Sequence, residues 1–121
     1  MSIRKILLVD DSPAQMVEMR NAVSSVDAHI IMATNGTEAI EKALAEKPDI
    51  IFMDIVMDNL DGFGACREIS RNEETSHIPI IFVTTKNQRA DRLWAEKQGA
   101  KAMITKPFDH QEIIDQINRF S

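Results

Sequence analysis

The sequence is poor in residues that mark several classes of protein. It has one cysteine, no tyrosine, and only four glycines and four prolines among 121 residues. One cysteine cannot close an internal disulfide, so a disulfide framework is excluded and the reducing cytoplasm is the expected compartment. No apolar run approaches the ~20 residues of a membrane span, so we expect no membrane insertion. The N-terminus is basic and then apolar, but it lacks a small-residue cleavage site, which argues against a signal peptide.

Positive charge is also in deficit. The 14 lysines and arginines stand against 19 aspartates and glutamates, giving a formal net charge of −5 and an isoelectric point near 5.1. Nucleic-acid-binding domains usually show a basic face, so this balance argues against a nucleic-acid partner. A chain of this length suits one domain, and 44% hydrophobic with 27% charged residues is typical of a globular protein.

Short apolar runs alternate with helical patterns five times along the chain. The predicted strands cover residues 3–9, 29–33, 49–54, 79–84 and 102–105. The first helix is expected to begin with Ser12 as N-cap and Pro13 as first residue, and to run to about Val26. Gln15 would close a capping box with Ser12. Three of the strands are almost wholly apolar, which predicts an α/β fold with a doubly wound, five-stranded parallel sheet.

Polar residues follow most of these strands. They are Asp10 and Asp11 after the first strand, Asp54 after the third, Thr84 and Thr85 after the fourth, and Thr105 and Lys106 after the fifth. In doubly wound sheets, ligands bind beyond the carboxyl ends of the strands. Taken singly, Asp11 is an ordinary helix cap and Lys106 an ordinary surface lysine. Together the residues predict three carboxylates, a hydroxyl and an ammonium converging at one edge.

This combination indicates a particular chemistry. Three neighbouring carboxylates repel one another unless a cation neutralises them. Mg²⁺ prefers oxygen ligands and typically takes one or two carboxylates together with phosphate oxygens. A lysine and a hydroxyl suit the remaining oxygens of a phosphoryl group, because phosphoryl transfer depends on positioning and charge neutralisation. The cluster therefore predicts a Mg²⁺ site beside a carboxylate that accepts a phosphoryl group.

Several motifs together resemble a known family over the whole chain. The motifs are Asp10-Asp11, Asp54 in MDIVM, Gly62 in LDGF, Thr84 in IFVTT, and Lys106-Pro107 in TKPF. They resemble the response-regulator receiver domain, the CheY-like family of two-component signalling. The stretches DDSPAQM, EKPDIIFMDIVM, ETSHIPIIFVTTK and WAEKQGAKAMITKP resemble more closely the stand-alone receivers of type IV pilus twitching motility, the PilH-like group.

The resemblance implies a role for each matching residue. The fold would be flavodoxin-like, (βα)5, with strand order 2-1-3-4-5. Asp54 would be the phosphoacceptor. Asp11 would ligate Mg²⁺ with Asp54 and the backbone carbonyl of Val56, and Asp10 would act mainly through a metal-bound water. Thr84 and Lys106 would contact the phosphoryl oxygens, and the peptide bond after Lys106 is usually cis in this family.

The resemblance also implies the partners. The phosphodonor would be a CheA-like histidine kinase, and a downstream protein would bind at the fourth helix, fifth strand and fifth helix. Residues 1–121 would form a single, monomeric receiver domain with no output domain, and the protein would not be an enzyme in the ordinary sense. Two further outputs stay open: draining phosphoryl groups from a shared kinase, and binding partners without phosphorylation.

Five positions depart from the family pattern or tune its chemistry. Asp58 stands where most receivers have proline, and it is either a residue near the metal or a solvated turn residue. Thr85 stands where many have alanine, and Met103 where an aromatic residue usually accompanies the movement of Thr84. Val56 and Lys86 occupy positions that the family uses to tune the lifetime of the phosphoryl group.

Two other functional classes fit the sequence less well. A phosphatase of the haloacid-dehalogenase type needs a second aspartate two residues after the nucleophile, and Val56, which stands there, cannot transfer protons. A flavodoxin-like FMN carrier needs a phosphate cradle after the first strand, where the acidic residues 10–15 would repel a phosphate. Cys66 lies three residues from both Phe63 and Ile69, so we expect it in the core and inert.

Overall fold

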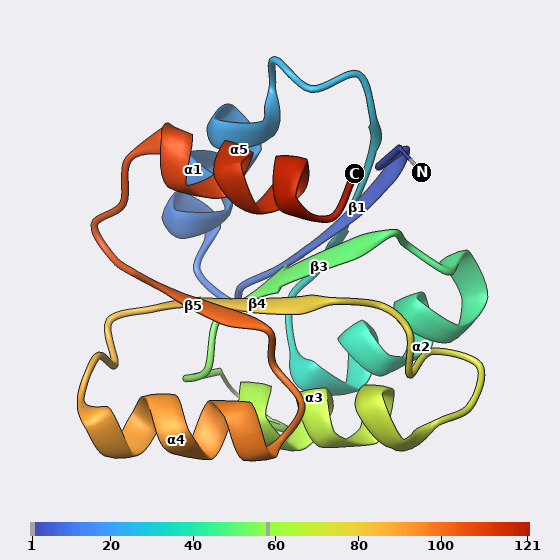
Figure 1. The fold of residues 1–121 in the computed structure, drawn as a ribbon, viewed down its shortest axis with the longest axis vertical. Coiled ribbons are helices and arrows are strands. Elements are labelled where there is room, and N and C mark those ends of the chain that lie inside the picture. The colour runs from blue at the N-terminus through green and yellow to red at the C-terminus, as the bar shows by residue number, and fades with distance from the viewer. Residues whose placement is uncertain (1, 58) are drawn as a thin grey trace.

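Figure 1 shows the computed structural model, which describes residues 2–57 and 59–121. Five strands alternate with five helices in this part of the chain. In order they are β1 (Lys5–Val9), α1 (Pro13–Val23), β2 (His29–Ala33), α2 (Gly36–Glu46), β3 (Ile50–Met53), α3 (Gly62–Arg71), β4 (Ile80–Thr84), α4 (Arg89–Lys97), β5 (Ala102–Thr105) and α5 (His110–Arg119). The strands are parallel in the order β2-β1-β3-β4-β5, which confirms the predicted fold and strand order.

The helices cover the sheet on both faces. In Figure 1, α1 and α5 lie above the sheet while α2, α3 and α4 lie below it. Alternate residues of β1 therefore enter two separate cores. Leu7 and Val9 face α2 and α3, whereas Ile6 and Leu8 face α1 and α5. Because both faces are buried, the central strands carry almost no polar residues until they reach their carboxyl ends.

The first helix begins as predicted, with Ser12 as N-cap and Pro13 as its first residue, but it differs from the prediction in its capping box and at its end. Ser12 caps it, since the Ser12 hydroxyl accepts from the Gln15 amide at 3.4 Å. The expected capping box is wrong in its second half, because the Ser12 amide donates to Asp10 Oδ1 at 2.9 Å instead of to Gln15. The helix ends at Val23 rather than Val26 because the Ser24 hydroxyl donates to the Asn21 carbonyl, competing with the helical pattern.

Three of the five strands are shorter than predicted at their amino ends, whereas β2 and β5 have the predicted bounds. β1 begins at Lys5 rather than residue 3, and β3 and β4 begin one residue later than expected. Ile3 is nevertheless buried, so its apolar side chain contributes to core packing although its backbone is not part of the strand. Strand carboxyl ends, which place the polar residues, lie within one residue of their predicted positions.

Candidate functional site

The sheet register brings the polar strand ends together. Val9 pairs with Met53, and Thr84 with Thr105, so the next residue of each strand emerges at the same edge. The ladder continues one step further, because the Asp54 amide donates to the Val9 carbonyl at 3.0 Å and the Lys106 amide to the Thr84 carbonyl at 2.8 Å. The backbone alone therefore fixes where these side chains start.

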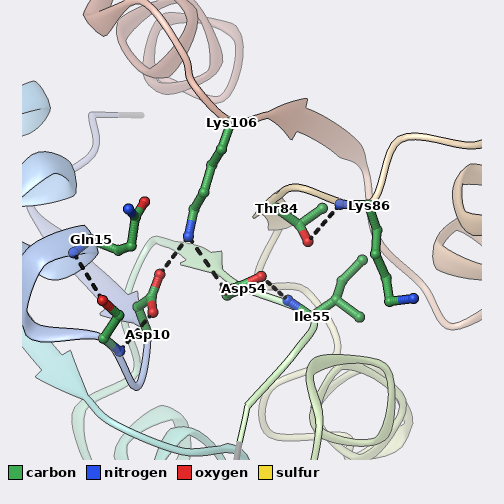
Figure 2. A network of polar contacts seen from close by, with 8 residues as sticks. Asp10, Gln15, Asp54, Ile55, Thr84, Lys86 and Lys106 are labelled. Atoms are coloured by element: carbon green, nitrogen blue, oxygen red, sulfur yellow. Dashed lines mark hydrogen bonds and ion pairs between the residues drawn. The ribbon is translucent and has the colours of Figure 1, made fainter.

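One lysine joins two of the predicted carboxylates. Lys106 Nζ lies 2.7 Å from Asp10 Oδ2 and 3.3 Å from Asp54 Oδ2, as Figure 2 shows. The side chains of Lys106, Asp10 and Asp54 are 8%, 0% and 14% exposed, so these charges are largely removed from water. Buried charges persist only when paired, and here one ammonium serves two carboxylates.

Backbone amides hold the other oxygen of each carboxylate. Asp10 Oδ1 accepts from the Ser12 amide at 2.9 Å, and Asp54 Oδ1 accepts from the Ile55 amide at 2.7 Å (Figure 2). Each carboxylate is thus oriented by one main-chain donor and one shared cation. Hydrogen bonds to charged groups are the strong ones, so both side chains are fixed in direction.

Thr84 takes a different partner. Its side chain is fully buried at the end of β4, and Thr84 Oγ1 accepts from the Lys86 amide at 3.2 Å (Figure 2). A hydroxyl that accepts one hydrogen bond keeps its own hydrogen for donation. The residue is therefore placed at the same edge as the carboxylates, with a loop amide as its partner.

The remaining predicted ligands lie nearer to solvent. Asp11 is exposed, and Val56 is 57% exposed. Within residues 2–57 and 59–121, no group of three or more histidine, cysteine, aspartate or glutamate side chains is close enough together to hold a metal ion. The carboxylates meet as a lysine-bridged pair, so the expected convergence of three is not assembled in this arrangement. Asp58 lies outside the described residues.

The chemistry of the donors nevertheless fits a hard divalent cation. Two carboxylates stand at one sheet edge, and the backbone of Val56 follows Asp54 by two residues. All of these are oxygen donors, the kind that Mg²⁺ prefers, and water can complete its shell on the exposed side. With Asp11, which follows Asp10 directly, Asp54 and the Val56 carbonyl would hold Mg²⁺, and Asp10 would act through a metal-bound water.

Three of the predicted modulating residues lie on β5 and in the loop after β4. Met103 is half-buried against the core that contains Phe82, its partner across β4 and β5. Lys86 and Thr85 are exposed in the loop after β4. The peptide bond between Lys106 and Pro107 is cis, which confirms the expectation from the resemblance.

Sequence reasoning missed one pocket beside Lys106. It measures about 320 Å³ and is lined by Gln15, Glu18, Thr85, Lys106, Pro107 and Phe108. Gln15 and Glu18 are three residues apart on α1, a spacing that places them on one helix face. That spacing was the only signal for the pocket, since its other wall comes from the loops after β4 and β5.

Cys66 is a core residue, as predicted. It is fully buried on α3, and its Sγ donates to the Gln98 carbonyl at 3.3 Å. Burial raises the pKa of the Cys66 thiol to about 11, with a smaller opposing effect from the hydrogen bond to Ser70. The group is therefore a neutral thiol at physiological pH, enclosed next to Ser70 and the Gln98 carbonyl.

No helix within the described ranges combines the length and the apolar character that a membrane crossing requires. Residues 6–118 match the family described as the response regulator receiver domain. The chain is 42% identical over 114 residues to protein PilH of Pseudomonas aeruginosa, covering 94% of both chains. It is 33% identical to chemotaxis protein CheY of Thermotoga maritima, covering 98% of both chains.

A solved structure gives the same result. The receiver domain of a sensor histidine kinase from Pseudomonas aeruginosa, crystallised with a magnesium ion coordinated in its active-site cleft, matches with a TM-score of 0.89. It is 28% identical, and the match covers 98% of both chains. Sequence and fold agree over almost the whole length, and the chain belongs to the response regulator receiver domain family.

Proposed function

We propose that this protein is a stand-alone response regulator that accepts a phosphoryl group on Asp54 from a histidine kinase in the presence of Mg²⁺. The observation that carries the proposal is the position of the Asp54 carboxylate, fixed by the Ile55 amide and within reach of the Lys106 ammonium. It stands at the carboxyl edge of the sheet, next to the buried carboxylate of Asp10. We place the protein in the cytoplasm, as a monomer.

This geometry supports the following transfer step. An Asp54 carboxylate oxygen attacks the phosphorus of a phosphohistidine, a P–O bond forms, and the P–N bond breaks. The histidine nitrogen leaves with the bonding electron pair and takes up a proton. Asp11, Asp54 and the Val56 carbonyl would hold Mg²⁺, with Asp10 acting through water, and the ion would neutralise charge on the phosphoryl oxygens.

The chain's own polar residues then change partners. Lys106 Nζ, which is 3.3 Å from Asp54 Oδ2, is close enough to donate to a phosphoryl oxygen bound there. Thr84 Oγ1 retains a hydrogen to donate once its loop adjusts. The new bonds favour one arrangement of the loop after β4 and of α4, so phosphorylation shifts the population of two states.

The output would pass through α4, β5 and α5. On α4, Leu93 and Trp94 are 51% and 48% exposed, and Arg89 and Arg92 lie on the surface. A hollow of about 440 Å³ lies between α4 and β5 and includes Met103. Exposed apolar and basic residues on one helix suit a protein partner with acidic and apolar groups.

The similarity to PilH favours a role in type IV pilus or chemotaxis-like motility control. The PilH and CheY relatives are matched over 94% and 98% of their own lengths, which favours a receiver that acts without an attached output domain. The same phosphoryl chemistry would serve a phosphate sink for a shared kinase. A phosphorylation-independent interaction module is the remaining alternative.

A mass measurement tests the proposal. The protein is incubated with acetyl phosphate and Mg²⁺, and its intact mass is measured before and after mild base. We expect a gain of one phosphoryl group that base removes, absent in Asp54→Asn and absent when EDTA withdraws the metal. Asp61→Asn is the matched control, because Asp61 caps α3 through the Gly64 amide at 2.9 Å and asparagine caps equally well. An adduct that persists in Asp54→Asn would refute the assignment.

A further inference from the structure

The loop between β3 and α3 is held at its base and again at its outer side. At the base, the Gly62 amide donates to the Ile55 carbonyl at 2.8 Å. This bond closes the loop on itself. The backbone of Val56 follows Ile55 directly, so a constraint on this loop limits the directions that the Val56 carbonyl can take.

The outer side of the loop is attached to the start of α2. Gly36 is the first residue of that helix, and its amide donates to the Leu60 carbonyl at 3.1 Å. The first amides of a helix have no acceptor within the helix, so the loop supplies one. A Cβ at Gly36 would overlap the Leu60 carbonyl, which is why only glycine allows the two backbones to approach so closely.

A second contact lies beside the first. The Thr37 hydroxyl donates to Asn59 Oδ1 at 3.0 Å. Asn59 has a φ of 66°, in the left-handed region that asparagine tolerates better than most residues. The pairs Gly36–Leu60 and Thr37–Asn59 therefore form two adjacent links between α2 and the loop, made by residues that are consecutive on each side.

We propose that Thr37 and Asn59 are positioning residues for the Mg²⁺ site, because their contact sets the loop that presents the Val56 carbonyl beside Asp54. This inference rests on the proposed function. A loop held in its binding conformation before the ion arrives loses less conformational entropy on binding. Without the Thr37–Asn59 contact the loop samples more conformations, and Mg²⁺ binds more weakly although none of its ligands has changed.

Linkage gives a second consequence. If the contact favours Mg²⁺ binding, Mg²⁺ binding must favour the contact by the same factor. The Gly36 amide reports on this directly, because its hydrogen bond to Leu60 must open before the amide exchanges with solvent. Mg²⁺ should therefore slow hydrogen exchange at Gly36, at the far side of the loop from the ligands.

Four variants of the full chain test the inference by calorimetric titration with Mg²⁺ in the absence of a phosphodonor. Thr37→Val removes the hydroxyl and keeps the side-chain shape, while Asn59→Gly removes the acceptor and keeps access to positive φ. We expect each to raise the Kd for Mg²⁺ by about threefold, the effect of losing one exposed hydrogen bond. The double variant should be no weaker than either single variant, and Thr37→Ser should bind as the wild type does.

A matched control separates positioning from general destabilisation. Lys47, at the other end of α2, also has a positive φ of 50°, and Lys47→Gly should leave the Kd unchanged. A wild-type Kd in Thr37→Val, or a Gly36 amide whose exchange ignores Mg²⁺ in the wild type, would overturn the inference while leaving phosphorylation of Asp54 intact. Failure of the wild type to bind Mg²⁺ and to take up phosphoryl groups would refute the proposed function, and the inference with it.

Discussion

Lys106 donates to Asp10 across a distance of 2.7 Å, between two side chains that are 8% and 0% exposed. The contact to Asp54 is longer, at 3.3 Å. The lysine is thus held chiefly by Asp10, and Asp54, the more exposed carboxylate, stands at the open side of the pair. This asymmetry suits a site in which one carboxylate reacts while the other keeps the lysine in place.

Removing the Lys106 side chain should destabilise the protein, because the Asp10 and Asp54 carboxylates then have no cation between them. We expect Lys106→Met to lower the free energy of unfolding by about 3 kcal/mol in urea titrations with EDTA present, because it leaves buried charges unpaired. Added Mg²⁺ should restore part of this loss, since the ion replaces the missing cation. Exposed Lys101→Met is the control and should be nearly neutral. An equal stability of Lys106→Met and wild type in EDTA would contradict this account of the pair.

Neutralising Asp10 should weaken the site through its lysine. In Asp10→Asn the shorter of the two Lys106 contacts loses its charge, and Lys106 is expected to pair more closely with Asp54. The rate of phosphorylation by acetyl phosphate should fall at least tenfold, an order of magnitude typical for loss of a positioned charge at a reacting centre. Intact-mass time courses measure it. A rate matching that of wild type would show that Asp10 has no part in the site.

Thr84 is expected to stabilise the phosphorylated protein more than it stabilises the unmodified one. Thr84→Val removes the hydroxyl that accepts from the Lys86 amide, and we expect a stability loss of about 1 kcal/mol in the unmodified protein. Phosphorylation should raise the midpoint of thermal unfolding of the wild type, and the rise should be smaller in Thr84→Val. Thr84→Ser keeps the hydroxyl and should behave as wild type. The same phosphorylation-induced rise in Thr84→Val would remove Thr84 from the mechanism.

The raised pKa of the Cys66 thiol predicts that the free energy of unfolding depends on pH. Burial raises the pKa of its thiol from 9.0 to about 11. Between these values the unfolded chain has lost the thiol proton and the folded chain has kept it, so stability falls as pH rises. The advantage of wild type over Cys66→Ala should shrink by at most about 1.4 kcal/mol for each pH unit in that window and stay constant below pH 9. A constant difference across the whole range would refute this.

The position of Gly99 should not accept a side chain. Its φ is +107°, and a Cβ there would overlap the Ser70 hydroxyl on α3. We expect Gly99→Ala to cost about 1–3 kcal/mol of unfolding free energy, from backbone strain and this contact. Combining it with Ser70→Gly should recover only the part that is due to the contact. Complete recovery in the double variant would show that the backbone carries no strain.

The amino-acid sequence by itself determined the order of elements, the parallel sheet and which residues reach its carboxyl edge. These follow from apolar runs of strand length, helical spacing between them and the polar residue after each run, all of which are local properties. The same local pattern misplaced the end of α1, because the Ser24 hydroxyl competes for a helical carbonyl. It also missed the Asp10 carboxylate as the acceptor for the Ser12 amide.

Only the tertiary structure decided how the polar residues pair. Lys106 bridges Asp10 and Asp54 across 96 and 52 residues of sequence, and Thr37 reaches Asn59 across 22. Such contacts depend on the register of neighbouring strands and on the path of a loop, which no local pattern specifies. The sequence therefore predicts which groups gather at the sheet edge, while the arrangement of the backbone determines which carboxylate holds the lysine more closely and which lies nearer to solvent.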